Sequence, residues 1–109
     1  MMRFEDHVRA ALDALPPHLA AALRNVAVVV EDEHPDDPDL YGLFDGVPLI
    51  EGGPGPGDLP ARIAVYRLPL EGDFPDPSEL EHEIRVTVLH ELGHYFGLDE
   101  DRLAELGYD

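Results

Sequence analysis

The sequence predicts a small α+β domain. Apolar residues with helical periodicity occur near both ends of the 109-residue chain, and short β-branched or alternating runs lie between them. This length is typical of one domain, so residues 1–109 are expected to form one fold with one principal site. A hydrophobic content of 44% is sufficient to build a core.

Two helices are predicted before the first strand. Apolar residues recur at steps of three and four over the first fifteen positions, and Pro16-Pro17 ends this amphipathic helix. Pro17 then opens a short second helix that runs to Asn25, because proline is tolerated at the first helical position. The apolar residues of the first helix are Phe4, Val8, Ala11, Leu12 and Leu15.

Strands are predicted in the middle of the chain. Val26 to Val30 is a β-branched run of strand length. Residues 40–50 favour one or two short strands with a turn at Asp45-Gly46. Ile63 to Leu68 alternates apolar and polar residues and predicts a further strand. Pro69 bounds that strand, which suggests a position at the edge of the sheet.

A long amphipathic helix is predicted in the last third. Ser78 and Glu81 have the spacing of a capping box, which places the first helical residue at Glu79. Gly97 is expected to end the helix, and the acids after Leu98 open a short terminal helix closed by Gly107. The apolar face of the long helix consists of Ile84, Val88, Leu89, Leu92, Tyr95 and Phe96.

The residue types available exclude several kinds of chemistry. The chain contains neither Cys nor Lys, so a thiol nucleophile, a Schiff base and a thiolate zinc site are all excluded. It is rich in carboxylates, with 24 Asp and Glu, and it has six His. These side chains are the ligands of oxygen- and nitrogen-coordinated metal sites and the groups of acid–base catalysis.

The charge of the chain narrows its expected partners and location. A formal net charge of −17 would repel nucleic acid and anionic membranes, so neither is expected to bind. The sequence lacks a recognisable secretion signal and any apolar run long enough to cross a bilayer, which predicts a cytoplasmic protein. The expected partner is a peptide or protein substrate, and the oligomeric state is left open.

The long helix carries a metal-binding pattern. His90-Glu91-Leu92-Gly93-His94 has the form HExxH. A four-residue step places both imidazoles on one helix face, one turn apart, where they can occupy two positions around a zinc ion. Glu91 lies about 100° around the helix from His90, where it can polarise a water bound to zinc. Glu83 and Thr87 share the face of the two histidines, opposite the apolar face.

A catalytic zinc site usually has a third protein ligand. In the extended pattern HExxHxxGxx(H/D), the last position is occupied here by Glu100. Asp101 and Asp99 flank it and are alternative ligands, and an external ligand is a further possibility. The same acids would also cap the terminal helix and favour its dipole without any metal.

The stretch VTVLHELGHYFGLDEDRLAELGYD, together with the upstream segments LYGLFDGVPL and RIAVYRLPL, resembles the small bacterial zincin-like metallopeptidases. The resemblance implies a minimal zincin fold, in which a small mixed sheet packs on an N-terminal helix and on the helix bearing HExxH. It also implies that His90 and His94 bind zinc and that Glu91 is the catalytic base. Larger zincins have His or Asp where this chain has Glu100.

These observations predict zinc-dependent peptide hydrolysis. Strand Ile63 to Leu68, if it is the edge beside the helix, would align an extended peptide by strand addition. Candidate donors to the oxyanion are Tyr41, Tyr66, His82 and Tyr108.

Two other functions are compatible with the sequence. The first is a zinc-binding protein with little or no peptidase activity that acts through a protein partner, since 109 residues leave little room for a second lobe. The second is an acidic adaptor or nucleic-acid mimic, which would require an ordered array of carboxylates.

Overall fold

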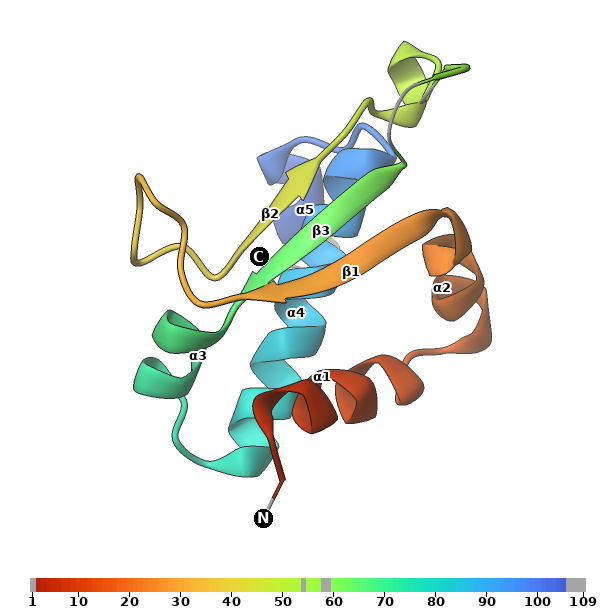
Figure 1. Ribbon diagram of the computed structural model, residues 1–109. Helices are drawn as coiled ribbons and strands as arrows, with labels where there is room; N and C mark the ends of the chain where they lie inside the picture. Colours follow the sequence, from red (N-terminus) through yellow and green to blue (C-terminus); the bar gives the residue numbers. More distant parts are fainter. Residues whose placement is uncertain (1, 54, 58–59, 106–109) are drawn as a thin grey trace.

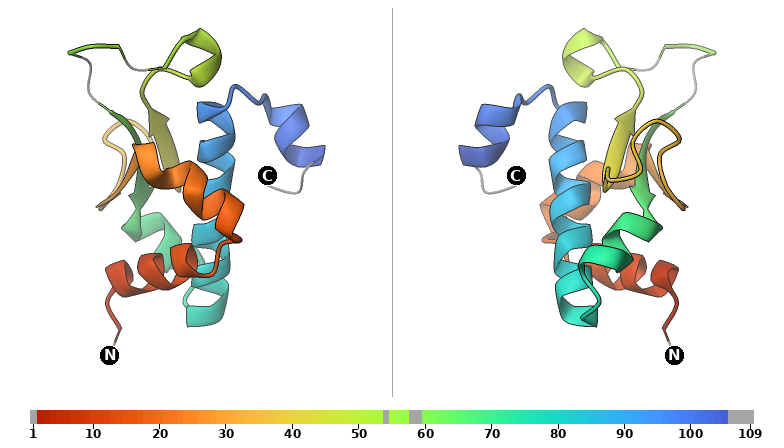
Figure 2. Two further views of the ribbon diagram at one scale, coloured as in Figure 1. Left: turned by 90° about the vertical axis from the view of Figure 1, so that its right-hand side faces the viewer. Right: turned by 90° about the vertical axis from the view of Figure 1, so that its left-hand side faces the viewer.

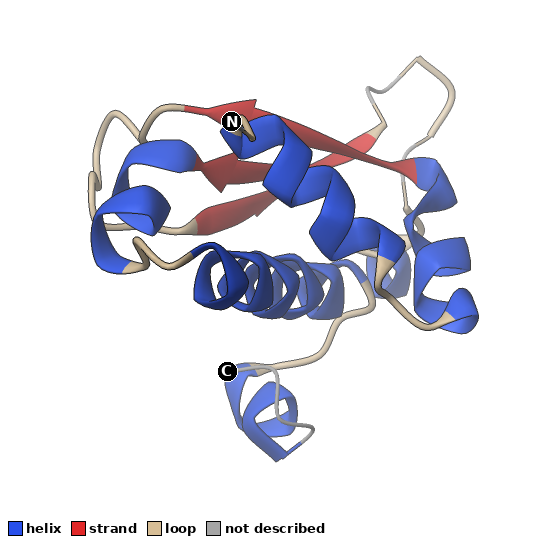
Figure 3. Ribbon diagram, turned by 90° about the horizontal axis from the view of Figure 1, so that it is seen from below, coloured by secondary structure: helices blue, strands red, loops and turns tan. Residues whose placement is uncertain are grey.

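A computed structural model describes residues 2–53, 55–57 and 60–105 of the chain. A three-stranded mixed sheet forms one layer, and the helices α1 (Phe4–Asp13) and α4 (Pro77–Tyr95) lie together on one of its faces (Figures 1 and 3). The short helix α5 (Glu100–Glu105) lies on the side of α4 that is turned away from the sheet (Figure 2). Helix α4 is therefore placed between the sheet and α5.

The N-terminal helices follow the predicted boundaries closely. Helix α1 buries Phe4, Val8 and Ala11, and it packs across α4 (Figure 2). Pro17 opens helix α2 (Pro17–Ala22), which continues as a 3₁₀ turn, η1 (Leu23–Asn25). The predicted second helix is thus confirmed, although its last turn is a 3₁₀ turn.

The sheet has the strand order β1-β3-β2. Strand β1 (Val26–Glu31) pairs in parallel with β3 (Ala61–Tyr66), and β2 (Gly42–Asp45) pairs antiparallel with the other side of β3. The predicted edge position for the strand at residues 63–68 is therefore wrong, because β3 is the central strand. The edge strand that contacts α4 is β2.

Pro69 does not border the sheet as predicted. Strand β3 ends at Tyr66, and residues from Arg67 onward form helix α3 (Arg67–Asp73), so Leu68 is helical. Pro69 is the third residue of α3, within the first turn, where a backbone N–H has no partner inside the helix. A proline there removes no helical hydrogen bond, which explains why it is tolerated.

Residues 40–50 form one strand, β2, followed by a second 3₁₀ turn, η2 (Leu49–Glu51). The start of α4 also differs from the prediction. Asp76, not Ser78, is the N-cap, and its carboxylate accepts a hydrogen bond of 3.0 Å from the backbone N–H of Glu79. Pro77 favours this earlier start because its fixed φ suits the first helical position.

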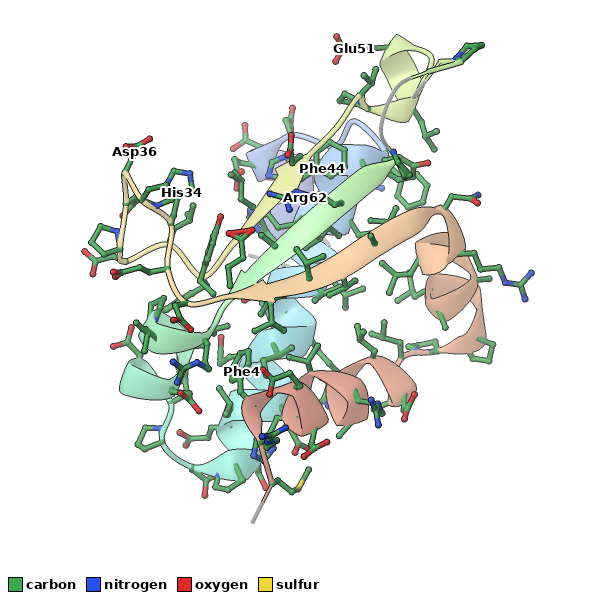
Figure 4. All side chains as sticks on the ribbon, viewed as in Figure 1. Phe4, His34, Asp36, Phe44, Glu51 and Arg62 are labelled. Atoms are coloured by element: carbon green, nitrogen blue, oxygen red, sulfur yellow. The ribbon has the colours of Figure 1, made fainter. Side chains whose placement is uncertain are left out.

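The core lies between the sheet and the two helices. Alternate residues of β3, namely Ala61, Ile63 and Val65, are fully buried there, together with Ile84 and Val88 of α4. On the opposite face of the sheet, Arg62 forms ion pairs with Glu31 and Asp45 of the neighbouring strands. Figure 4 labels Arg62 on β3.

No helix among the described residues is long and apolar enough to cross a membrane.

Candidate metal centre

The C-terminal half of α4 carries the two histidines of the HExxH pattern. The rings of His90 and His94 lie one turn apart, with centroids separated by 5.1 Å and planes inclined by 74°. Both side chains are partly exposed, with 21% and 33% of their surface accessible. The helix ends just beyond them, where the N–H groups of Gly97 and Leu98 bond the carbonyls of His94 and Gly93. This is a Schellman motif, and Gly97 supplies its positive φ of 81°.

The turn after α4 brings Glu100 back to both imidazoles. One carboxylate oxygen, Oε2, lies 3.2 Å from Nε2 of His90, and the other, Oε1, lies 3.1 Å from Nε2 of His94. The Schellman motif reverses the chain so that α5 runs back beside α4 (Figure 2). The residue predicted first as the third ligand is thus the one that meets the histidines.

The two alternative acids have other positions. Asp99 accepts a hydrogen bond of 2.9 Å from the backbone N–H of Arg102, so its side chain caps the start of α5. Asp101 is exposed in the first turn of the same helix. Neither makes the contacts with His90 and His94 that Glu100 makes.

Glu91 points from α4 toward the sheet. Its side chain is buried, and Oε1 accepts a hydrogen bond of 2.8 Å from the backbone N–H of Phe44 on β2 (Phe44 is labelled in Figure 4). The other oxygen, Oε2, lies 3.9 Å from Nε2 of His90. Burial raises the pKa of this carboxyl above its usual value, and the Phe44 hydrogen bond and the two neighbouring histidines lower it.

Gly42 allows β2 to approach α4 this closely. A β-carbon at this position would lie 2.5 Å from Cγ2 of Thr87 and 3.0 Å from the carbonyl oxygen of Ala64. Both distances are shorter than van der Waals contact, so any larger residue would push the edge strand away from the helix. Glycine at this point therefore sets the distance between the edge strand and Glu91.

A hollow of about 230 Å³ adjoins His90 on the side toward the start of α4. We call it the Glu83 hollow. It lies between α4 and the segment 40–42 that leads into β2. Its lining consists of Leu40, Tyr41, Gly42, Glu83, Val86, Thr87, His90 and Glu91.

The candidate oxyanion donors have different surroundings, and one of them has its hydroxyl engaged by another side chain. The hydroxyl of Tyr41 donates a hydrogen bond to Asp73, and Tyr66 stacks edge-on against His34, which comes from the loop between β1 and β2 (labelled in Figure 4). His82 is exposed and lines a separate hollow with Glu79 and Glu83. Tyr108 and Gly107, the predicted end of the terminal helix, lie outside the described residues.

The donor set fits a zinc ion. His90, Glu91 and His94 each offer a ligand atom within 4.8 Å of the others. Two ligands bound to zinc at about 2.0–2.1 Å with tetrahedral angles are about 3.3 Å apart. The contacts of Glu100 with the two imidazoles, 3.1 and 3.2 Å, match this spacing, whereas Glu91 is held back by its hydrogen bond to β2. Two imidazoles and a carboxylate are a common ligand set for zinc.

The family model for zincin-like metallopeptidases matches residues 23–108, which begin at the first residue of η1. The chain belongs to this family. The predicted α+β fold, a minimal zincin-like arrangement of a small mixed sheet and an HExxH helix, is confirmed. Among curated proteins, no sequence matches this chain.

The matched range includes every element that contributes to the centre and excludes α1 and α2. Sequence reasoning did not identify two contributors on β2, the backbone N–H of Phe44 and the small volume of Gly42. A glycine inside a strand was the available signal, since it often marks a close approach of another backbone or side chain.

Proposed function

We propose that the chain is a zinc-dependent peptidase in which His90, His94 and Glu100 hold the metal and Glu91 is the general base. The observation that carries this proposal is that the two carboxylates occupy different positions relative to the imidazoles. Glu100 meets both imidazoles, while Glu91 is fixed beside them by the amide of Phe44. A bound zinc ion would supply Lewis acidity, which acidifies water and polarises a peptide carbonyl.

Glu91 accepts the proton of the attacking water. Its Oε1 is occupied by the Phe44 amide, so Oε2, the oxygen nearer to His90, is the one that takes the proton. The carboxyl then returns this proton to the departing amine. The partial burial of Glu91 excludes bulk water and favours transfer of the proton within the site.

Strand β2 is suited to hold an extended peptide. It is an edge strand of the sheet, and it lies against α4 above Glu91. A substrate segment added to its outer edge would form main-chain hydrogen bonds with groups other than the Phe44 N–H, which Glu91 occupies, and would pass over the metal centre. This role was predicted for strand 63–68, which is central and has partners on both sides.

Zinc content and peptide cleavage of the full chain test this proposal. The purified protein is loaded with zinc and incubated with a peptide library, and products are identified by mass spectrometry. Glu91→Gln is expected to lower the cleavage rate by about 10²- to 10⁴-fold, the usual contribution of a general base, with one zinc ion retained. His94→Ala is expected to lose both zinc and cleavage.

Either of two results would contradict the peptidase proposal. A zinc-loaded wild type that cleaves no peptide would instead favour the zinc-binding protein that acts through a partner. A Glu91→Gln variant that cleaves at the wild-type rate would remove Glu91 from the mechanism.

A further inference from the structure

The Glu83 hollow combines three kinds of surface beside the metal centre. Leu40 and Val86 give it aliphatic walls, Tyr41 adds an aromatic wall, and Glu83 adds a carboxylate. At 1.5 Å per residue, the seven residues from Glu83 to His90 correspond to about 10.5 Å along α4. A group that reaches Glu83 from the metal centre must therefore be long.

Glu83 is half-buried. Within residues 2–53, 55–57 and 60–105, no Arg or His forms an ion pair with it. A partly buried carboxylate favours a cationic or hydrogen-bonding partner, because burial removes part of its hydration. The hollow thus offers an acceptor for a positive charge.

Tyr41 forms a fixed wall of the hollow. Its ring packs on Phe74, with centroids 5.6 Å apart, and its hydroxyl donates to Asp73. The hydrogen bond to Asp73, burial, and the charges of Asp73, Glu83 and Asp39 raise the pKa of Tyr41 to about 12. These carboxylates make the surroundings of the hollow negative.

We propose that the Glu83 hollow is a specificity pocket for a cationic side chain, Arg or Lys, of the peptide substrate close to the bond that is cleaved. The proposal rests on the peptidase function given above. The aliphatic walls would cover the methylene stem, the ring of Tyr41 would lie against the cationic head, and Glu83 would pair with it.

The charge of the whole molecule acts in the same direction. A formal net charge of −17 attracts cationic peptides and repels acidic ones before contact. The long-range attraction is general, whereas the pairing with Glu83 selects one position of the peptide. The two contributions can be separated by changing one carboxylate at a time.

Binding measurements test the pocket without requiring turnover. The zinc-loaded full chain carrying Glu91→Gln is titrated into fluorescent peptides that differ only in one residue, which is Arg, Lys, norleucine or Glu. We expect the Arg and Lys peptides to bind at least about ten-fold more tightly than the norleucine peptide, the usual effect of a hydrogen bond to a charged group. The Glu peptide should bind most weakly.

Substitutions at the pocket assign the preference to Glu83. Adding Glu83→Gln should bring the Arg and Lys peptides to the affinity of the norleucine peptide, and Glu83→Arg should favour the Glu peptide. The matched control is Glu5→Gln on α1, which removes the same charge at an exposed position outside the hollow and should keep the preference. Thermal unfolding of each variant verifies that it is folded.

The outcomes separate this inference from the peptidase proposal. Equal affinity for the Arg and norleucine peptides, a preference that survives Glu83→Gln, or an equal loss in Glu5→Gln would each overturn the pocket. A preference that depends on Glu83 in a protein that cleaves nothing would keep the pocket and reject the peptidase. If the wild type cleaves peptides that have no cationic residue near the cut bond, the peptidase proposal is kept and the pocket is rejected.

Discussion

The two sides of α4 hold their carboxylates in different ways. On the sheet side, Glu91 is 9% exposed, and it is fixed by the Phe44 amide beneath a strand whose distance is set by Gly42. On the other side, the side chain of Glu100 is 67% exposed and extends from a six-residue helix. The fold determines the position of Glu91, whereas the position of Glu100 depends mainly on the imidazoles that it contacts.

The largest difference between the two sides is expected when each carboxylate is replaced by a neutral side chain and zinc affinity is measured. We expect Glu100→Ala to weaken zinc binding at least about 10- to 100-fold, because even the loss of a group that only supports a ligand has that effect. Glu91→Gln should leave zinc affinity nearly unchanged. Competition with a chelator measures both affinities.

The neighbouring acid serves as the control for Glu100. Asp101→Ala removes the same charge from the same turn of α5, and zinc affinity should be retained. If Asp101→Ala loses zinc and Glu100→Ala does not, the third ligand has been assigned to the wrong residue.

The sheet side can be changed at Gly42. Gly42→Ala places a β-carbon 2.5 Å from Cγ2 of Thr87, so β2 must move away from Glu91. Overpacking of this kind costs about 1–3 kcal/mol of unfolding free energy. Peptide cleavage should decline further than zinc affinity, because the proposed ligands lie on α4 and α5. Denaturant unfolding, kcat/KM and zinc titration measure the three effects.

Thr87→Ser distinguishes a steric cause from other effects of Gly42→Ala. Serine lacks the clashing Cγ2 atom, so the double variant should recover part of the lost stability and activity. The carbonyl of Ala64, 3.0 Å from the added carbon, would limit the recovery. If Thr87→Ser recovers nothing, the close approach of β2 to Thr87 is not what positions the strand.

The centre was easier to predict from the sequence than the sheet. His90, Glu91 and His94 lie within five residues of one helix, where the 3.6-residue period alone relates their side chains. Glu100 follows after a short turn with a glycine, so its approach is also a local property of the chain. The metal-binding roles of these residues are still predictions, but their proximity is observed.

The sheet depends on contacts between distant segments. Strand β3 became central because β1, thirty-five positions earlier by the register Val26↔Ala61, pairs with one side of it, and β2 pairs with the other. Pro69 alone predicts an edge strand, but a proline also fits the first turn of a helix. The hydrogen bond from Phe44 to Glu91 likewise joins segments whose proximity no local pattern predicts.

A smaller effect is expected at the far end of α4. Nδ1 of His7 on α1 lies 2.6 Å from Oε2 of Glu81, and both side chains are mostly buried. A double-mutant cycle with His7→Ala and Glu81→Gln should give a coupling of about 0.5–3 kcal/mol in unfolding free energy. Zinc affinity should not change, since neither residue is near the centre. A loss of zinc in either variant would mean that the two ends of α4 are not independent.

The smallest effect concerns ionisation of Tyr41 on the sheet side. Because the hydrogen bond to Asp73 raises its pKa from 10.0 to about 12, the protonated form is favoured in the folded chain. This contribution to stability is fully present below about pH 10 and is lost as the pH rises through about 12. Near-ultraviolet absorbance, compared with Tyr41→Phe to assign the signal, measures the titration.

Asp73→Asn should return the Tyr41 pKa toward its ordinary value, because it removes the carboxylate that accepts the Tyr41 hydrogen bond and whose charge disfavours the phenolate. The variant should leave zinc affinity at neutral pH unchanged, as Tyr41 borders the Glu83 hollow and contacts neither Glu100 nor the imidazoles through an ion pair or hydrogen bond among the described residues. It should also weaken binding of the Arg peptide slightly, since one of the carboxylates around the hollow becomes neutral. If Tyr41 titrates near its ordinary pKa of 10.0 in both the wild type and Asp73→Asn, Asp73 does not hold the ring. The hydrogen bond that supports the aromatic wall of the Glu83 hollow would then be absent.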